Sequence, residues 1–330
     1  MPRTRLAIYV VAATVVAAAS VAVLEAKHAL PLLDGTNLVA YAQAARQRLA
    51  YIATAESMVV YGSRRLRSVA QIASAPGGRS RITYVAGDLK GAVVGSDGRR
   101  LWRYDPRARR VVVGAGTVTQ PDARILLVNH DVTVDGSDRV AGRPVYVVSL
   151  MTRNDHRRLQ RLWLDAETYL PLRFETYGPQ GHLMSSTVYK TIEYRAPDPS
   201  VFRVPVASGT PVLGDVHEPR RCASLTELEH LVGTRVLLPR YVPVGLSAVT
   251  YYCRTCPYCH RKSSIVRYSN GVSSFVVYQC SPSCRVSDVL AARDFGPGRI
   301  VHLTTSRARF CLVGNLPASE MKRVADSLPR

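Results

Sequence analysis

The chain has 330 residues, with 44 Lys or Arg against 24 Asp or Glu, so its formal net charge is +20. This length predicts about two domains. Hydrophobic residues make up 47% and charged residues 21%, which is ordinary for a packed globular protein and excludes a mainly disordered or fibrous chain. Only five basic residues are lysines, which leaves 39 arginines. They favour an anionic partner (nucleic acid, lipid head group or acidic peptide), or else reflect a composition bias that spreads arginine over the surface.

The first segment predicts export. Arg3 and Arg5 precede an uncharged run rich in Ala and Val over residues 6–24, which is typical of a signal peptide or a signal anchor. We assign residues 1–26 to this segment, and both cleavage and transmembrane anchoring stay open. Because the basic start stays in the cytoplasm, the rest of the chain is expected to be periplasmic or otherwise extracytoplasmic. That location argues against nucleic acid, and no helix-turn-helix pattern or basic helix supports such a partner.

A first domain is expected over residues 36–196, with one helix and a series of short strands. Thr36 or Asn37 can cap the helix, whose apolar face would contain Leu38, Tyr41, Ala42, Ala45, Leu49 and Ile52. Runs rich in β-branched and aromatic residues follow, separated by Gly, Asp and Pro turns. They cover residues 81–85, 91–94, 101–104, 111–113, 145–150, 162–164, 172–175 and 187–194. The pattern predicts an antiparallel sheet and not a βαβ enzyme fold.

A second, smaller α+β domain is expected over residues 222–330. Residues 197–221 hold five prolines without sustained periodicity, and we interpret them as the linker. After it, the sequence predicts a short helix, several strands and a C-terminal helix that begins near Pro317. The strands are expected at 246–252, 264–268, 273–278 and 300–304. Asn270-Gly271 predicts a two-residue type I′ hairpin between two of them.

Cysteines cluster in this second domain. Cys253, Cys256, Cys259 and His260 form C-x2-C-x2-C-H, and Cys280 and Cys284 form C-x3-C. If the strands make a meander, the two motifs follow strands that end at the same edge of the sheet. We therefore expect all six potential ligands to converge.

Several chemistries remain open for these residues. A structural Zn²⁺ site would use Cys256, Cys259, Cys280 and Cys284, with Cys253 and His260 as alternates. Disulfides are an alternative because the exported compartment is oxidising. Residues 256–260 also match the C-x-x-C-H pattern of haem attachment, and Cys-Pro-Tyr-Cys resembles a redox dithiol, although here it joins two β runs. Outside the cluster, Cys222 and Cys311 could pair with each other or stay buried and inert.

Enzymatic motifs are absent from the sequence. It contains no P-loop, H-E-x-x-H, G-x-S-x-G or G-x-G-x-x-G pattern. Asp165 and Glu167 lie beside a predicted turn and are interpreted as a strand terminus, not as an acid/base pair. We expect a protein that is not an enzyme.

Motifs in both halves together resemble the MucB/RseB family of extracytoplasmic sigma-factor regulators, from about Leu38 to the C-terminus. In the first domain they are Ser-Asp-Gly-Arg at 96–99, Trp-Arg-Tyr-Asp-Pro at 102–106, Val-Ala-Gly-Arg-Pro at 140–144, Arg-Leu-Trp-Leu-Asp at 161–165, Thr168 and Leu-Pro-Leu at 170–172. In the second they are Leu-Pro at 238–239, Pro-Val-Gly-Leu at 243–246, Tyr-Ser-Asn-Gly at 268–271 and Val-Gly-Asn-Leu-Pro at 313–317.

The resemblance implies an α+β protein. Its first domain would be a curved antiparallel half-barrel with packed helices, similar to lipoprotein carriers, followed by a smaller α+β domain. It further implies a non-enzymatic regulator of the envelope stress response that binds the extracytoplasmic domain of a membrane anti-sigma factor, with a lipid or lipoprotein as the signal. The rival hypothesis is an envelope metal or redox sensor that uses the cysteine cluster.

The half-barrel also suggests where an anionic ligand would bind. Alternate strand positions would line an apolar cavity suited to acyl chains, while arginines at the rim would suit anionic head groups. The candidates are Arg103, Arg143 and Arg173, each flanked by apolar strand residues, and the alternative for each is an outward solvated side chain. Trp102 and Trp163 are expected in the core.

Overall fold

The computed structural model describes residues 34–329 apart from 62–63, 99, 107–108, 116–122, 154, 179, 205–211, 215–218, 257–258 and 285–298. The predicted export segment, residues 1–26, lies outside the described residues. The described residues fold as two compact units, 34–214 and 219–329. Among the described helices, none has both the length and the apolar character needed to cross a membrane.

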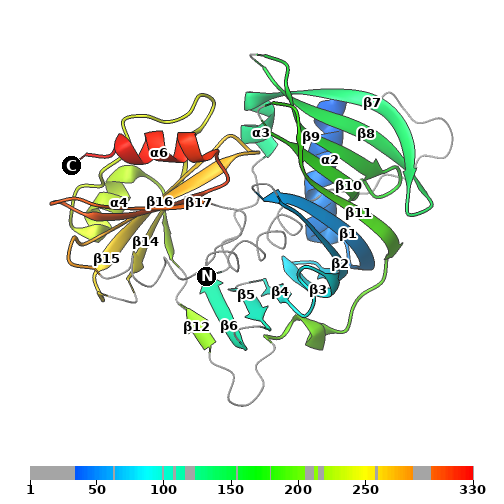
Figure 1. Ribbon diagram of the computed structural model, residues 1–330, viewed down its shortest axis with the longest axis horizontal. Coiled ribbons are helices and arrows are strands. Elements are labelled where there is room, and N and C mark those ends of the chain that lie inside the picture. The colour runs from blue at the N-terminus through cyan, green and yellow to red at the C-terminus, as the bar shows by residue number, and fades with distance from the viewer. Residues whose placement is uncertain are drawn as a thin grey trace. The chain divides into compact units, whose positions relative to one another are not determined.

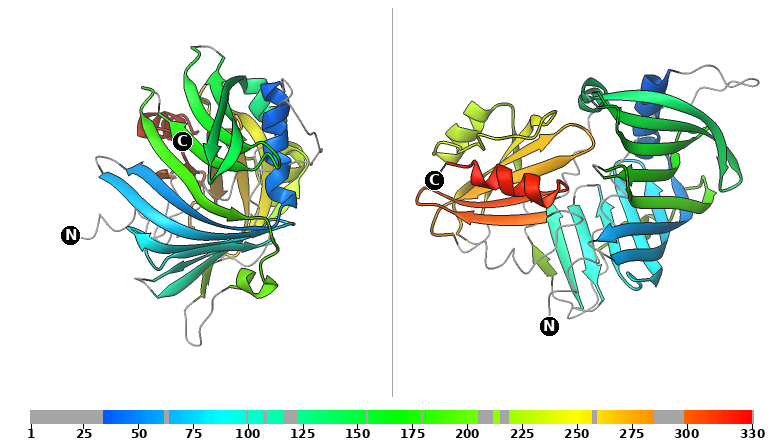
Figure 2. Two further views of the ribbon diagram at one scale, coloured as in Figure 1. Left: turned by 90° about the vertical axis from the view of Figure 1, so that its right-hand side faces the viewer. Right: turned by 45° about the horizontal axis from the view of Figure 1, so that its top comes forward.

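The first unit is built on one twelve-stranded sheet (Figure 1). Its strands in chain order are β1 (Tyr51–Tyr61), β2 (Arg64–Ala75), β3 (Arg79–Gly87), β4 (Val93–Asp97), β5 (Arg100–Asp105), β6 (Arg110–Ala115), β7 (His130–Val140), β8 (Arg143–Thr152), β9 (Arg158–Asp165), β10 (Pro171–Tyr177), β11 (Leu183–Glu193) and β12 (Val212–Gly214). The spatial order is β12-β6-β5-β4-β3-β2-β1-β11-β10-β9-β8-β7. All neighbours are antiparallel except β12 and β6. The sheet is strongly curved, and its two ends stay open (Figure 2). The predicted curved antiparallel sheet is therefore confirmed.

The main helix of this unit, α2 (Gly35–Arg48), packs against β2, β7, β8 and the short helix α3 (Ala123–Asn129). Asp34 caps it, since its Oδ1 accepts a hydrogen bond from the Thr36 backbone N–H at 3.2 Å. The predicted cap at Thr36 or Asn37 is therefore wrong. The helix ends at Arg48, and the extended backbone of Leu49 leads into β1, so the predicted helical position of Ile52 is wrong as well.

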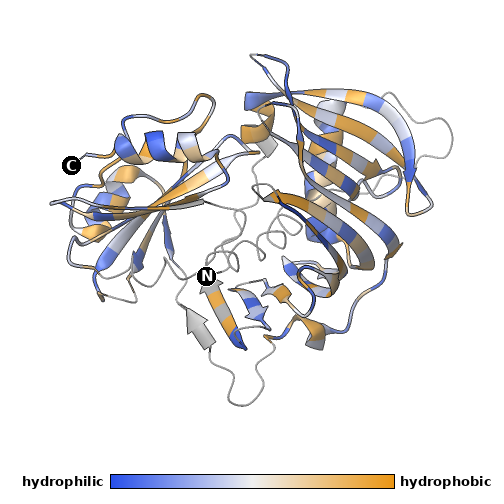
Figure 3. Cartoon of the chain, in the orientation of Figure 1, coloured by the Kyte–Doolittle hydropathy of each residue, from blue (hydrophilic) through white to orange (hydrophobic). Residues whose placement is uncertain are grey.

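Strands β1, β2 and β7 extend the sheet beyond the predicted runs. Burial alternates along β2, as expected for a strand with one face on the core. Hydrophobic and hydrophilic positions alternate along many strands of the sheet (Figure 3). β7 forms one edge, is mostly exposed, and is interrupted by a register shift between Val134 and Gly136, where Gly136 has φ of 123°. The proline-rich stretch contains the 3-10 helix η3 (Pro199–Phe202) and β12.

The second unit has a six-stranded antiparallel sheet of order β13-β14-β15-β16-β18-β17. Its elements are β13 (Arg220–Cys222), α4 (Leu225–Val232), β14 (Ser247–Thr255), β15 (Lys262–Ser269), β16 (Ser274–Cys280), β17 (Arg299–Thr304), β18 (Arg309–Gly314) and α6 (Ala318–Asp326). Ser224 and Gly233 cap the two ends of α4, and Pro317 precedes α6 as predicted. This second sheet with two helices confirms the predicted smaller α+β part.

The predicted hairpin at Asn270-Gly271 exists, but its turn type differs. β15 and β16 pair up to Ser269 and Ser274, which leaves a four-residue loop and not a two-residue type I′ turn. Gly271 takes a positive φ of 95°, whereas Asn270 does not. The Asn270 Oδ1 instead accepts hydrogen bonds from the backbone N–H groups of Val272 and Ser273, at 3.0 and 2.7 Å.

Candidate functional site

Three cysteines meet at one edge of the six-stranded sheet. Cys256 directly follows β14, Cys280 is the last residue of β16, and Cys284 lies in the turn after β16. Because β14 and β16 both run antiparallel to β15, which lies between them, their C-terminal ends are at the same edge. The meander thus brings together thiols that are more than twenty positions apart in the sequence.

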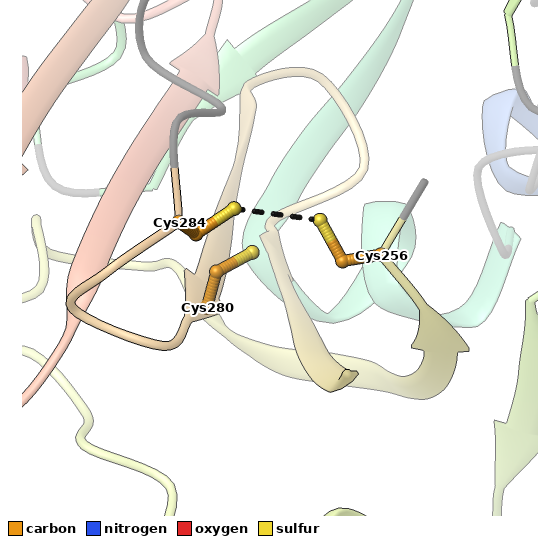
Figure 4. A group of neighbouring side chains, drawn as sticks. All are labelled: Cys256, Cys280 and Cys284. Atoms are coloured by element: carbon orange, nitrogen blue, oxygen red, sulfur yellow. Dashed lines mark hydrogen bonds between the residues drawn. The ribbon is translucent and has the colours of Figure 1, made fainter. Parts of the chain in front are cut away.

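The three thiols point toward one another (Figure 4). Their Sγ atoms all lie within 4.8 Å of each other, and the Sγ atoms of Cys256 and Cys284 are 3.6 Å apart. All three residues are buried, and Cys256 and Cys284 have no exposed surface. We call Cys256, Cys280 and Cys284 the cysteine trio. Its geometry suits a thiophilic metal ion, for which thiolate sulfur is the preferred ligand.

Two further cysteines and two arginines surround the trio. Cys311 is buried in the same cluster, and the half-buried Cys259 packs against it. Arg309 donates a hydrogen bond from Nη1 to the Cys284 carbonyl oxygen. The Arg254 guanidinium lies 5.3 Å from the ring centroid of Tyr278, which also packs on the cluster. Positive charge is therefore placed beside thiols.

Two thiols in this cluster, those of Cys280 and Cys311, have a raised pKa. The hydrogen bond with Cys256, together with burial, raises the pKa of Cys280 far above its usual value. Burial raises the pKa of Cys311 to about 12, against an opposing effect from Arg254. A redox-active cysteine instead needs a lowered pKa and some exposure. Neither Cys280 nor Cys311 fits the catalytic-thiol alternative.

The predicted convergence of six ligands is wrong for Cys253 and His260. Successive residues of a strand face opposite sides of the sheet, and Cys253 belongs to the core on the other side from the trio, together with Cys222. His260 is exposed. The same division separates Cys222 from Cys311, so the suggested bridge between them is also wrong. Haem attachment requires an accessible thioether position at Cys256, which is completely buried.

Arg143 belongs to an acidic network in the first unit. Its guanidinium forms ion pairs with Asp165 and, at 2.5 Å, with Glu167. Asp165 is only 1% exposed and also accepts hydrogen bonds from the Tyr194 hydroxyl at 3.1 Å and from the backbone N–H groups of Glu167 and Thr168. The charge of Arg143 is therefore balanced within the protein. The backbone hydrogen bonds that Asp165 accepts stabilise the turn after β9.

The other two rim candidates lie apart from each other. Arg173 on β10 forms an ion pair with Glu175 at 2.5 Å and stacks on Trp163, with 4.1 Å between its guanidinium carbon and the ring centroid. Arg103 lies on β5 and is half-buried. An anionic-ligand role for Arg103, Arg143 and Arg173 stays a prediction.

The sequence analysis missed a buried arginine on α2. Arg46 is 8% exposed, and none of its three guanidinium nitrogens has a hydrogen-bond partner among the residues that the structure describes. Its guanidinium carbon lies 5.5 Å from the Phe174 ring centroid, and burial lowers its pKa although Tyr189 and Tyr51 act in the opposite direction. Arg46 lies four residues after Ala42, so its place on the apolar face was visible in the sequence. A buried guanidinium without partners has five donors available for an anionic group.

Comparison with known proteins gives one family match and several similar structures. Residues 107–206 match the family model of the MucB/RseB N-terminal domain. The sigma-E factor regulatory protein RseB of Salmonella typhimurium is 26% identical over 212 residues, which is 63% of this chain and 61% of that protein. The sigma factor AlgU regulatory protein MucB of Pseudomonas aeruginosa is 25% identical over 204 residues, which is 60% of each chain. The match thus spans about three fifths of the length of these curated relatives.

Solved structures of MucB share the fold. The MucA/MucB complex of Pseudomonas aeruginosa has a TM-score of 0.57 at 19% identity, and the match covers 89% of this chain and 98% of that chain. MucB in a further structure has a TM-score of 0.56 at 18% identity, with 89% and 97% covered. By their names, the curated relatives are regulatory proteins. The resemblance seen in the sequence is confirmed.

Proposed function

We infer that this chain, which carries the N-terminal domain of the MucB/RseB family, is a non-enzymatic regulator that binds the extracytoplasmic part of a membrane anti-sigma factor. The match to that domain over residues 107–206 is the observation that carries this proposal. The shared fold supports it, because MucB has been solved as a complex with MucA. The family resemblance implies that such a partner restrains a sigma factor and that the regulator protects it from proteolysis.

The charge and the first segment of the chain are consistent with this role. A net charge of +20, carried mostly by arginine, favours association with an acidic peptide and speeds the encounter. Arg3, Arg5 and the apolar run after them support export, which would place the folded part on the same side of the membrane as the partner's extracytoplasmic segment.

A capture experiment tests the partner. The tagged full chain is expressed in its native host, crosslinked, and purified from detergent-solubilised membranes, and the bound proteins are identified by mass spectrometry. We expect a membrane protein with a cytoplasmic sigma-factor-binding domain, whose isolated extracytoplasmic segment then binds the purified chain in a titration. A partner list that contains only lipid-carrier components would overturn the proposal, as would a segment that fails to bind.

An anionic lipid is the ligand we propose for the first unit, and Arg46 supports it. Leaving a guanidinium buried without hydrogen bonds is unfavourable, and a carboxylate or phosphate group would satisfy it. The aromatic surroundings of Arg46, which include Phe174, suit the apolar part of the same molecule. Ligand occupancy would then be a signal that changes the affinity for the protein partner.

Binding of a fluorescent long-chain fatty acid tests the role of Arg46. The matched control is Arg48→Met, because Arg48 lies in the same last turn of α2 but is exposed. We expect Arg46→Met to weaken binding by about tenfold or more, since a hydrogen bond to a charged group contributes roughly 1.5–3 kcal/mol. Arg48→Met should bind as the unchanged protein does. Equal affinities for the two variants would remove Arg46 from the ligand site.

A further inference from the structure

The cysteine trio takes no part in the proposed function, and nothing in the resemblance to MucB/RseB proteins accounts for it. We propose that Cys256, Cys259, Cys280 and Cys284 bind one Zn²⁺ ion in a tetrahedral site. The site would tie the end of β14 to the end of β16, across the intervening strand β15. It would be structural, because four protein ligands leave no position open for water or substrate.

The number of converging thiols favours a metal over a disulfide. Three Sγ atoms from two separate segments lie within 4.8 Å of one another. A disulfide joins only two of them, and the third would have to pair outside the trio, with Cys259 or Cys311. A metal ion uses all three, and buried thiols that surround a single point are what a thiolate metal site requires.

The distances also fit a zinc tetrahedron. With Zn–S bonds of about 2.3 Å, two sulfurs of a tetrahedral site are separated by about 3.8 Å. The Sγ atoms of Cys256 and Cys284 are 3.6 Å apart, so a zinc ion needs only a slight adjustment of these side chains. Thiolate sulfur with tetrahedral geometry is typical of zinc, whereas magnesium and calcium prefer oxygen ligands.

Cys259 is the fourth ligand in this proposal. It packs against the cluster and follows Cys256 at the C-x2-C spacing of structural zinc sites. Backbone hydrogen bonds fold the turn back on Cys256, whose carbonyl oxygen accepts from His260 N–H at 2.9 Å and whose N–H donates to the Arg261 carbonyl oxygen at 2.8 Å. The Cys259 Sγ is not among the three sulfurs that lie within 4.8 Å of one another, so its side chain would have to turn toward them; it is half-buried and therefore less restrained by packing than the buried Cys311.

The surrounding charges suit a four-thiolate site. One Zn²⁺ with four thiolates carries a net charge of −2, which is costly to bury unless positive groups lie close by. Arg309 binds the backbone of Cys284, and Arg254 acts electrostatically on the thiol of Cys280. The two guanidinium groups supply the compensating charge.

Metal content of the full chain tests the proposal. The protein is purified without added metal and without a chelator, and its zinc content is measured by inductively coupled plasma mass spectrometry. We expect one zinc per chain. Replacement by Co²⁺ should give the intense visible and near-ultraviolet bands of a tetrahedral cobalt thiolate site. Both measurements use the unchanged protein, so they do not depend on whether a variant folds.

Matched variants assign the ligands. Cys280→Ser and Cys259→Ser should each lose zinc or bind it at least tenfold more weakly, and they should weaken the cobalt thiolate bands. Cys253→Ser and Cys222→Ser remove buried cysteines from the other side of the sheet and should keep one zinc per chain. The proposal is overturned if the purified protein contains no metal and its non-reduced peptide map shows a disulfide bond formed by a cysteine of the trio. Zinc affinity in Cys280→Ser equal to that of the unchanged protein, or cobalt bands that are unchanged in Cys259→Ser, would overturn it as well.

Discussion

Replacing Arg46 by Met should make the ligand-free protein more stable. The change removes a guanidinium that is 8% exposed and lacks hydrogen-bond partners, at a burial cost of roughly 1–3 kcal/mol. It also removes the contact with Phe174, which contributes about 0.5–2 kcal/mol. Met is shorter than Arg, but it is flexible and fills irregular space well. We therefore expect a net gain of about 1 kcal/mol in the free energy of unfolding.

Fluorescence can follow this change in the first unit alone. The protein has two tryptophans, Trp102 and Trp163, and both lie in that unit. A gain of about 1 kcal/mol corresponds to a rise of roughly 2–4 °C in the melting temperature of a domain of this size. Arg48→Met is the control. Arg48, like Arg46, places a positive charge at the C-terminus of α2, where it interacts favourably with the helix dipole, but Arg48 is exposed, so its replacement removes no buried charge. If Arg46→Met melted below the control, Arg46 would hold a stabilising contact and the reasoning would fail.

Three further changes test other parts of the structure. Asp165→Ala should destabilise the first unit by about 3–5 kcal/mol in urea unfolding, because it removes the buried partner of Arg143, which keeps only Glu167, and takes this acceptor from the Tyr194 hydroxyl and from two backbone N–H groups; a loss below about 1 kcal/mol would contradict that network. Burial lowers the pKa of His130 in the folded chain. Below about pH 6.5 the unfolded chain therefore binds a proton that the folded chain does not, and the free energy of unfolding should decrease as the pH is lowered. His130→Gln should reduce this slope in melting experiments and the exposed control His156→Gln should not; equal slopes would refute the assignment. Gly314→Ala would place a Cβ 2.5 Å from the Cβ of Phe275 and should lower the free energy of unfolding of the second unit by about 1–3 kcal/mol. Circular dichroism should show this loss, while the midpoint of the tryptophan fluorescence transition, which reports on the first unit, stays unchanged; a shifted fluorescence midpoint would contradict a local effect.

Much of the sheet could be predicted because its strands carry β-branched and aromatic residues in short runs. β2 escaped prediction because it is rich in Arg, Ala and Ser, which have little preference for strands. β1 does carry Tyr, Ile, Thr and Val, but the predicted helix was extended into it as far as Ile52. The period-two burial of both strands was the remaining signal. β7 is an edge strand with an exposed, polar sequence, so it has neither an apolar alternation nor an apolar run. Its place in the sheet depends on pairing with β8, a long-range contact that no local pattern reveals.

The cysteine site was also predictable only in part, because local patterns indicate strands and turns but not every side chain's position. The meander follows from local strand and turn signals, so the meeting of Cys256 with Cys280 and Cys284 could be foreseen. Which face each side chain takes depends on where the strand ends, and β14 continues to Thr255, which keeps Cys253 on the opposite face. Arg46 shows a different limit: its spacing from Ala42 places it on the apolar face of the helix, but its burial was not expected because a charged residue is rarely buried without a partner.

The open sheet of the first unit has a consequence for aggregation. A long unpaired edge offers backbone donors and acceptors to any other chain, and such edges nucleate intermolecular β-pairing. β7 exposes Asp138 and Arg139 along that edge, and its bulge near Gly136 breaks the regular ladder that an added strand would need. The polar sequence that made this strand hard to predict thus opposes the addition of a strand at the edge. Binding of a partner or ligand is then expected at the faces of the sheet and not at its edge.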